Sequence, residues 1–381
     1  MPPAPGLLQQ PEERPPHPAN PTGVTPTPDR TAVTETGPIT YRDAGVDIAA
    51  QDAALSAAKD AVRATFTPGV LSDMGLFGGL FDLAKAGCDG HVLVASADGV
   101  GTKLEVAKRM GVHDTVGRDL VQHCINDILV QGARPLFFMD YVGTGRLEPD
   151  VVADLIRGCA NACQDAGMAL LGGETAEMPG LYGDGDFDLV GFIVGAVARD
   201  KVLDGSRVAP GQTLIGLRSS GLHTNGYSLA RKVLFERLGL DVDDRPDALG
   251  GASVGEALLA PHLSYLSLLW PLLEANRICA MAHITGGGLV DNVPRVLGSC
   301  DAVIDTSTWE VPPLFRMIVE AAGIDRDEAY QALNMGIGMV LFVDDADREA
   351  VESHLTTAGE DFVVIGHTEP AATESGVVRW A

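Results

Sequence analysis

Short apolar runs alternate with helical patterns along most of the chain. Four runs, at 91–95, 136–142, 168–171 and 189–197, predict buried strands, because each is a brief, continuous apolar segment. Residues 117–131 instead place their apolar side chains on one face of a helix. The inward side chains of this helix are expected to be Leu120, Val121, Cys124, Ile125, Ile128 and Leu129.

A second block of alternating elements follows a Pro210-Gly211 turn. Before this turn, in the first block, a further helix is predicted to begin at Pro149, since proline suits the first helical turn. We expect two domains, at 37–209 and 210–381, and a surface insertion in the polar, glycine-rich stretch 239–256. In the second domain the patterns predict strands at 213–217, 280–284, 302–305, 338–343 and 362–366, and helices near 227–238, 262–275, 313–322 and 348–357.

Residues 1–36 lack this periodicity. They are rich in proline and threonine, which predicts a disordered tail with no catalytic role, the alternative being a partner-binding proline motif. No apolar run in the chain reaches the roughly 18 residues of a membrane span. The N-terminus also lacks the basic-then-apolar layout of a signal peptide. Together these features predict a cytoplasmic protein without a membrane partner.

Composition narrows the choice of partners. The chain has 381 residues, 46% of them hydrophobic, and a formal charge of -25. An acidic surface repels polyphosphate backbones, which argues against nucleic-acid binding, and an anionic substrate would need local cations or amide donors. Six cysteines occur without Cys-x-x-Cys spacing. Cys159 and Cys163, one helical turn apart, are expected to be buried thiols in a reducing cytosol.

Three carboxylates stand in or beside glycine-rich segments. Asp98 precedes Gly99 and Gly101, Glu174 follows Gly172-Gly173, and Asp127 lies at the edge of an apolar helical stripe. Magnesium binds nucleotide phosphates through one or two carboxylates, so these acids would form a Mg-ATP site if the sheet brings them together. The alternative interpretations, without a metal site, are an Asx-type turn at Asp98 and a solvated helix carboxylate at Asp127.

Two further segments carry histidine and amide side chains next to glycine. Residues 219–228 contain His223 and Asn225 and lead into a helix, whose N-terminus can bind an anion. In the alternative, Asn225 or Ser228 only caps that helix. His283 leads into three consecutive glycines, which suggests close approach of the backbone to a ligand. The P-loop, protein-kinase and Gly-x-Ser-x-Gly motifs are missing.

Six blocks together resemble the phosphoribosylformylglycinamidine cyclo-ligase family, also called aminoimidazole ribonucleotide synthetases. They occur in the family's order and span roughly residues 38 to 370, and the Glu-Thr-Ala-Glu-Met-Pro-Gly stretch that begins at Glu174 points to the cyclo-ligase branch. The blocks are 41–48, 98–103, 126–135, 172–180, 219–228 and 283–288.

The resemblance implies a two-domain α/β (α+β) fold of the ATP-binding superfamily. It also implies a homodimer in which the N-terminal domains pair their strands into a barrel. The implied reaction converts formylglycinamidine ribonucleotide and ATP, with Mg2+, into aminoimidazole ribonucleotide, ADP and phosphate. The γ-phosphoryl group activates the formyl oxygen, and a substrate nitrogen then closes the ring. Two alternative interpretations remain. The chain could be another enzyme of the superfamily, such as thiamine-monophosphate kinase, selenophosphate synthetase or a small formylglycinamidine synthetase. It could also be a nucleotide-binding scaffold of the hydrogenase-maturation type.

The resemblance also assigns site residues. The metal ligands would be Asp98, Asp127 and Glu174, and His223 or His283 would move protons during ring closure. The other implied catalytic residues are Asn225 and Thr285. Residues implied to bind ATP or substrate are Lys59, Gly78, Gly79, Asp98, Gly99, Thr102, Lys103, Ser220, Gly221, Gly286, Gly287 and Gly288. Ser72, Asp73 and Leu76 replace glycines of a family loop, and Gln51-Asp52 replaces another family pattern.

Overall fold

Four strands from the first half of the chain form a mixed sheet in the order β1-β4-β2-β3. In the computed structural model, residues 48–71, 81–373 and 375–381 are described. The predicted tail and the loop with Gly78 and Gly79 lie outside them. β4 is antiparallel to both of its neighbours, and β2 and β3 are parallel. The strands are β1 (Val92–Gly99), β2 (Arg134–Thr144), β3 (Ala169–Glu177) and β4 (Phe187–Val197).

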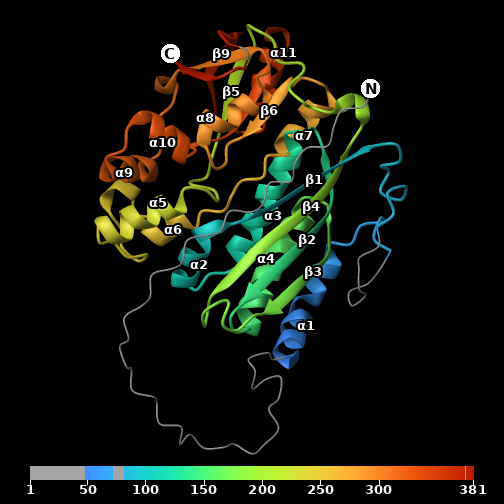
Figure 1. Cartoon of the computed structure of the whole chain (residues 1–381). Helices are drawn as coiled ribbons and strands as arrows, with labels where there is room; N and C mark the ends of the chain where they lie inside the picture. The colour runs from blue at the N-terminus through green and yellow to red at the C-terminus, as the bar shows by residue number, and fades with distance from the viewer. Residues whose placement is uncertain (1–47, 72–80, 374) are drawn as a thin grey trace, which may run out of the picture. The chain divides into compact units, whose positions relative to one another are not determined.

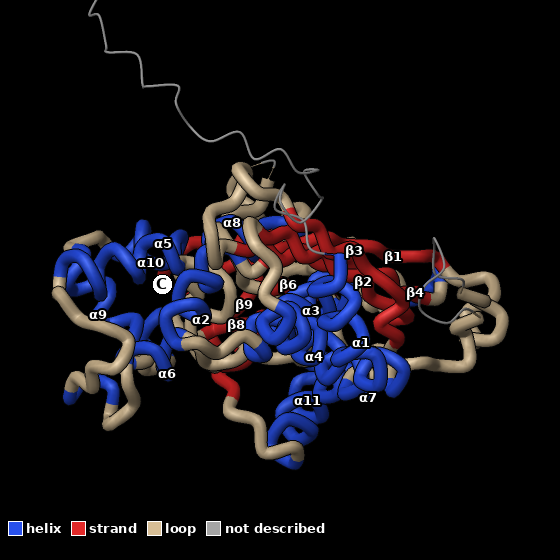
Figure 2. Tube along the Cα trace, turned by 90° about the horizontal axis from the view of Figure 1, so that it is seen from below, coloured by secondary structure: helices blue, strands red, loops and turns tan. Residues whose placement is uncertain are grey.

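Helices α3 (Asp114–Leu129) and α4 (Pro149–Asp165) cover one face of this sheet (Figures 1 and 2). The six inward side chains predicted for α3 are all buried, and Pro149 begins α4. The two helices approach closely because Gly117 and Gly158 lie at their contact. An added Cβ at Gly158 would lie 2.0 Å from the Asp114 carbonyl oxygen. Helices α1 (Ile48–Ala64) and α2 (Leu104–Met110) complete this half.

Six strands from the second half form another sheet, in the order β10-β7-β9-β5-β8-β6. β10 and β7 are parallel, and the remaining pairs are antiparallel. The strands are β5 (Thr213–Arg218), β6 (Ala280–His283), β7 (Cys300–Ile304), β8 (Ile337–Val343), β9 (Phe362–Pro370) and β10 (Val378–Trp380). The helices are α5 (Tyr227–Arg231), continued by a π-helix (Lys232–Arg237), α6 (Val254–Leu258), α7 (Leu266–Glu274), α8 (Gly288–Asn292), α9 (Pro313–Ala322), α10 (Arg326–Ala332) and α11 (Asp345–Thr357).

Every strand predicted from the pattern is present, but three expectations were wrong in detail. The strand predicted at 168–171 does not end before the glycines, because β3 continues through Gly172 and Gly173 to Glu177. The helix expected from residue 262 begins at Leu266, since the backbone amides of His262 and Tyr265 are held by side chains of α3. The stretch 239–256 is only partly a surface insertion, because it buries Val242 and Val254.

Both sheets belong to one unit, Tyr41–Ala381. No helix among the described residues is long and apolar enough to cross a membrane. The division into two domains at 209/210 stays a prediction.

Candidate active site

The end of β1 and the middle of α3 place two carboxylates around one imidazole. Alternate side chains of β1 face α3, so Ser96 and Asp98 both point toward the helix. The His123 Nε2 atom lies 2.6 Å from Asp98 Oδ2 and 3.6 Å from Asp127 Oδ2. His123 and Asp127 are four residues apart and therefore share one helix face. Asp98 was expected just beyond a strand but lies within β1.

The second half of the chain supplies the opposite wall. His283, at the end of β6, brings its Nδ1 atom within 2.9 Å of Asp127 Oδ1. The β6–α8 loop adds Thr285 and Gly286, and Asn225 precedes α5. Six of the residues predicted for the site thus line one cavity of about 660 Å³: Asp98, Asp127, Asn225, His283, Thr285 and Gly286.

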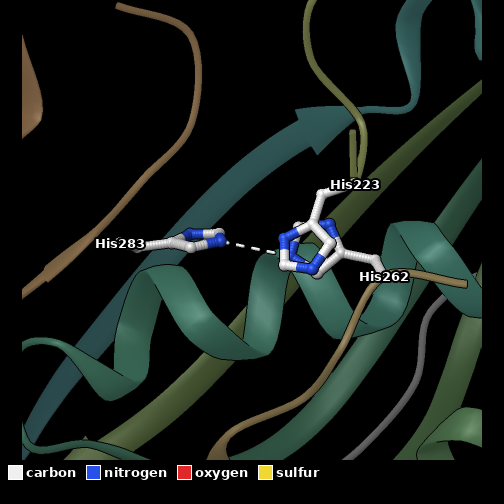
Figure 3. A group of neighbouring side chains, drawn as sticks. All are labelled: His223, His262 and His283. Atoms are coloured by element: carbon white, nitrogen blue, oxygen red, sulfur yellow. Dashed lines mark hydrogen bonds between the residues drawn. The ribbon is translucent and has the colours of Figure 1, made fainter. Parts of the chain in front are cut away.

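His283 also belongs to a cluster of three buried histidines, whose other members, His223 and His262, do not line the cavity (Figure 3). A hydrogen bond of 3.1 Å joins the Nε2 atoms of His262 and His283. The rings of His223 and His262 stack at a centroid distance of 3.9 Å. Parallel rings direct their nitrogens side by side, so this stacked pair does not converge on one point as ligands of a tetrahedral metal do.

Burial and charge set the protonation states. Burial lowers the pKa of His223 and of His262 well below the ordinary value, and it lowers that of His283 against the opposing effect of Asp127. His123 differs, because its contacts with Asp98 and Asp127 outweigh burial and raise its pKa.

The pKa values of the two carboxyl groups shift in the opposite direction to the pKa of His123. Burial alone would raise the pKa of Asp98 and of Asp127, but their histidine partners lower both below the ordinary value. The cavity therefore presents two ionised carboxylates beside a neutral His283.

Such a donor set fits magnesium, a hard cation that prefers oxygen ligands. The side chains of Asp98 and Asp127 keep 42% and 24% of their surface exposed, so their oxygens remain accessible.

Glu174 does not join these two acids within one chain. It pairs with Tyr141 of β2, which pairs with Val190 of β4, which in turn pairs with Gly99 of β1. At about 4.8 Å per strand, this puts the Glu174 backbone roughly 14 Å from that of Gly99. Sequence reasoning could place each acid in or near a strand, but it could not give the order of the strands.

Lys103 was predicted to bind ATP or substrate, and the structure shows a different environment. Its side chain is fully buried, and its Nζ atom lies 2.6 Å from Asp119 Oδ2. It also donates hydrogen bonds to the carbonyl oxygens of His223 and Ala260. Lys103 therefore holds segments of the second half against the first half and has no surface free for a ligand.

His223 was expected to be a polar cleft residue but is fully buried and does not line the cavity. Its Nε2 atom accepts a hydrogen bond from the Ser220 amide. Its backbone has a φ of 58°, in the left-handed region. No side chain caps α5, so the alternative that Asn225 or Ser228 serves as a cap is wrong.

Two of the three consecutive glycines are explained by packing or by backbone conformation. An added Cβ at Gly288 would lie 2.0 Å from the Tyr330 carbonyl oxygen, and Gly287 has a φ of 93°. Gly286 alone lines the cavity.

The remaining predicted residues lie outside the cavity lining. Lys59 is exposed on α1, and Thr102 bonds to Ser228 through their hydroxyl groups. Gly99 donates its amide to Asp98 Oδ1. Ser220 is exposed and Gly221 is buried.

Sequence reasoning missed three residues of the site. His123 looked like one more position on an amphipathic helix, although its i,i+4 spacing to Asp127 was a usable signal. His262 fell within a predicted helix. Arg295 also lines the cavity, and no described residue forms an ion pair with it.

Comparison with known proteins gives two family models. One, described as the N-terminal domain of AIR synthase related protein, matches residues 80–197, and the corresponding C-terminal domain matches 209–379. A phosphoribosylformylglycinamidine cyclo-ligase of Syntrophotalea carbinolica is 51% identical over 337 residues, which are 88% of this chain and 96% of that protein. Another, of Trichlorobacter lovleyi, is 48% identical over 332 residues, 87% of this chain and 95% of that protein.

Solved structures with this fold are more distant in sequence. Thiamine-monophosphate kinase from Stenotrophomonas maltophilia superposes with a TM-score of 0.65 at 19% identity, over 85% of this chain and 95% of that one. The hydrogenase maturation protein HypE in complex with ATP gives 0.58 at 20% identity, over 87% and 91%. At these identities the structures show the fold alone.

Proposed function

Because this chain belongs to the phosphoribosylformylglycinamidine cyclo-ligase family, we propose that the cavity between β1, α3 and the β6–α8 loop is its active site. The protein is an ATP-dependent ligase of purine biosynthesis, and it closes the imidazole ring of aminoimidazole ribonucleotide. One observation carries the assignment of the site: six residues predicted from four distant segments line the same cavity. The alternative functions, a kinase or a maturation scaffold, are supported only by similarity of fold.

The two carboxylates would hold magnesium with ATP. Asp98 and Asp127 are ionised, partly exposed and next to each other across His123. When bound, the ion neutralises charge that develops on the phosphoryl oxygens. Glu174 is not part of this set within one chain.

His283 is the best placed group for proton transfer. Its Nδ1 atom is bonded to Asp127, so Nε2 is the basic atom of the ring, and burial keeps the imidazole neutral. Nε2 would exchange its hydrogen bond with His262 for one with the substrate and accept a proton from the attacking nitrogen. The nitrogen attacks the activated carbon of the same bound molecule, the ring closes, and phosphate leaves that carbon. Orientation of that molecule supplies much of the rate. Asn225 and Thr285 are positioned to orient it, and Arg295, which has no ion-pair partner among the described residues, is positioned to bind its phosphate.

Other features support a proposed oligomeric state, location and domain boundary. The face of the first sheet opposite α3 carries Leu93, Met139 and Phe192, each at least 38% exposed, which supports a homodimer that covers this face. Six free cysteines among the described residues fit a reducing cytoplasm. The end of the first family match at residue 197 and the start of the second at 209 support a domain boundary near 209/210.

The test compares wild-type protein with His283→Gln and Asp98→Asn, using formylglycinamidine ribonucleotide, ATP and magnesium. Product is followed by mass and by a colour assay for the aminoimidazole. We expect His283→Gln to lower kcat by about 10²- to 10⁴-fold with little change in the KM for ATP. Asp98→Asn should raise the magnesium concentration that gives half-maximal rate.

The exposed His367 provides the matched control, and His367→Gln should keep the wild-type rate. Near wild-type turnover in His283→Gln would rule out the proton-transfer role. An unchanged magnesium titration in Asp98→Asn would rule out the metal role.

A further inference from the structure

A second cavity, of about 580 Å³, lies apart from the active site. Its walls come from residues 81–91, the beginning of β2, the end of β4 and the C-terminal end of α7. Leu203 is the one described residue that lines both this cavity and the active-site cavity. Neither Asp98 nor Asp127 contributes to it.

Cations gather around this second cavity. Lys85, Arg134 and Lys201 line it, and none of their side chains forms a hydrogen bond or ion pair with a described residue. Glu274 is the single acidic residue among the lining residues that the structure describes. The chain as a whole has 27 basic and 52 acidic residues. Three cations without a partner in the described parts of the chain, against one acid, therefore reverse the charge balance of the chain as a whole and create a local attraction for anions.

The rest of the lining is apolar and partly aromatic. Phe81 and Trp270 contribute rings from opposite halves of the chain, and Leu273 and Ile278 contribute aliphatic surface. Trp270 is half-buried, so part of its ring faces the cavity. Aromatic rings favour planar partners through stacking or edge contacts.

We propose that this cavity binds an anion with a planar aromatic body, of the nucleoside monophosphate class. Lysine and arginine suit the phosphate, and the tryptophan and phenylalanine rings suit the base. The volume falls within the range of about 300–1,000 Å³ found for small-molecule sites. The ligand would contact β2 and α7 at once and so bridge the two halves of the chain. This site is independent of ring closure.

The probe is guanosine 5′-monophosphate, titrated into the full chain by calorimetry with saturating Mg-ADP present to fill the active site. We expect one molecule to bind per chain and to quench the fluorescence of Trp270. Guanosine alone and inorganic phosphate alone should each bind at least tenfold more weakly, because each engages only half of the lining.

The decisive variant is Arg134→Gln combined with Lys201→Gln, which should weaken binding at least tenfold and keep the ring-closing rate. Lys232→Gln, an exposed lysine on the π-helix, is the matched control and should bind as wild type does. Trp270→Phe should abolish the quench but not the binding.

Three outcomes would overturn the proposal: no saturable binding, equal binding in the double variant, or loss of binding in Asp98→Asn, which would place the nucleotide in the active site. Failure of the ring-closure assay is measured separately and leaves this result unaffected.

Discussion

At single positions of this protein, neighbouring atoms determine which residue fits and how it titrates, as Asp140 and Gly173 show. Asp140 lies on β2 beneath the helices, and burial raises the pKa of its carboxyl to about 7. An added Cβ at Gly173 would lie 2.5 Å from Asp140 Oδ1. A glycine in a segment that suggested a ligand loop thus makes room for a buried acid.

The raised pKa of Asp140 predicts a pH effect on stability. Below about pH 4 both the folded and the unfolded states carry the proton, and between about 4 and 7 only the folded state keeps it. The unfolded state then binds fewer protons, so the free energy of unfolding falls as pH rises, by at most ~1.4 kcal/mol per unit for this group. Asp140→Asn should remove this contribution, so the free energy of unfolding of the variant should increase relative to that of wild type between pH 5 and 8.

Urea denaturation of both proteins across that range measures the difference. Asp60→Asn, an exposed acid on α1, is the control and should follow wild type. The same pH slope in wild type and in Asp140→Asn would contradict the prediction.

At the scale of elements, β1 has a different role on each of its faces. Ser96 and Asp98 point to α3 and build the active site. Leu93 and Ala97 point the other way. Ala97 pairs with Phe192 of β4, which pairs with Met139 of β2, so their side chains share that outer face. One strand therefore contributes polar side chains to the active site on one face and belongs to an exposed apolar surface on the other.

The outer face of the first sheet predicts the oligomeric state. Wild-type protein should sediment at about twice its chain mass of 39.9 kDa. Phe192→Lys, which places a charge in the middle of the apolar face, should shift the protein toward the single-chain mass at micromolar concentration. Leu238→Lys is the control, because Leu238 is 42% exposed at the end of the π-helix, away from this sheet. A single-chain mass for wild type would contradict the prediction.

At the scale of the whole molecule, a buried ion pair joins the two halves. Lys103 and Asp119 come from the first half, and both reach across to the second. Lys103 binds the carbonyl oxygens of His223 and Ala260, and Asp119 accepts from the His262 amide. These contacts hold the histidine cluster against α3.

Removal of one partner of this pair should be costly. Lys103→Met leaves Asp119 buried without its counter-charge, which is expected to cost about 3–5 kcal/mol of unfolding free energy. Adding Asp119→Leu to the same chain removes the stranded charge and should recover part of the loss. Lys232→Met, at the surface, should stay within about 0.5 kcal/mol of wild type.

The midpoint of chemical denaturation measures all three variants of the Lys103–Asp119 test. A double variant less stable than Lys103→Met would show that the uncompensated Asp119 charge is not the cause.

The sequence by itself determined the elements and the family. Strands such as 189–197 and the inward face of α3 could be predicted because local periodicity reports burial. The signature blocks fixed the reaction, and they also indicated Asp98, Asp127 and His283.

Only the tertiary structure decided which side chains meet. Strand order separated Glu174 from Asp98, and packing between the halves buried Lys103 and His223. The same packing brought His123 and Arg295 into the site. These outcomes depend on contacts between residues far apart in the chain, and no local pattern records such contacts.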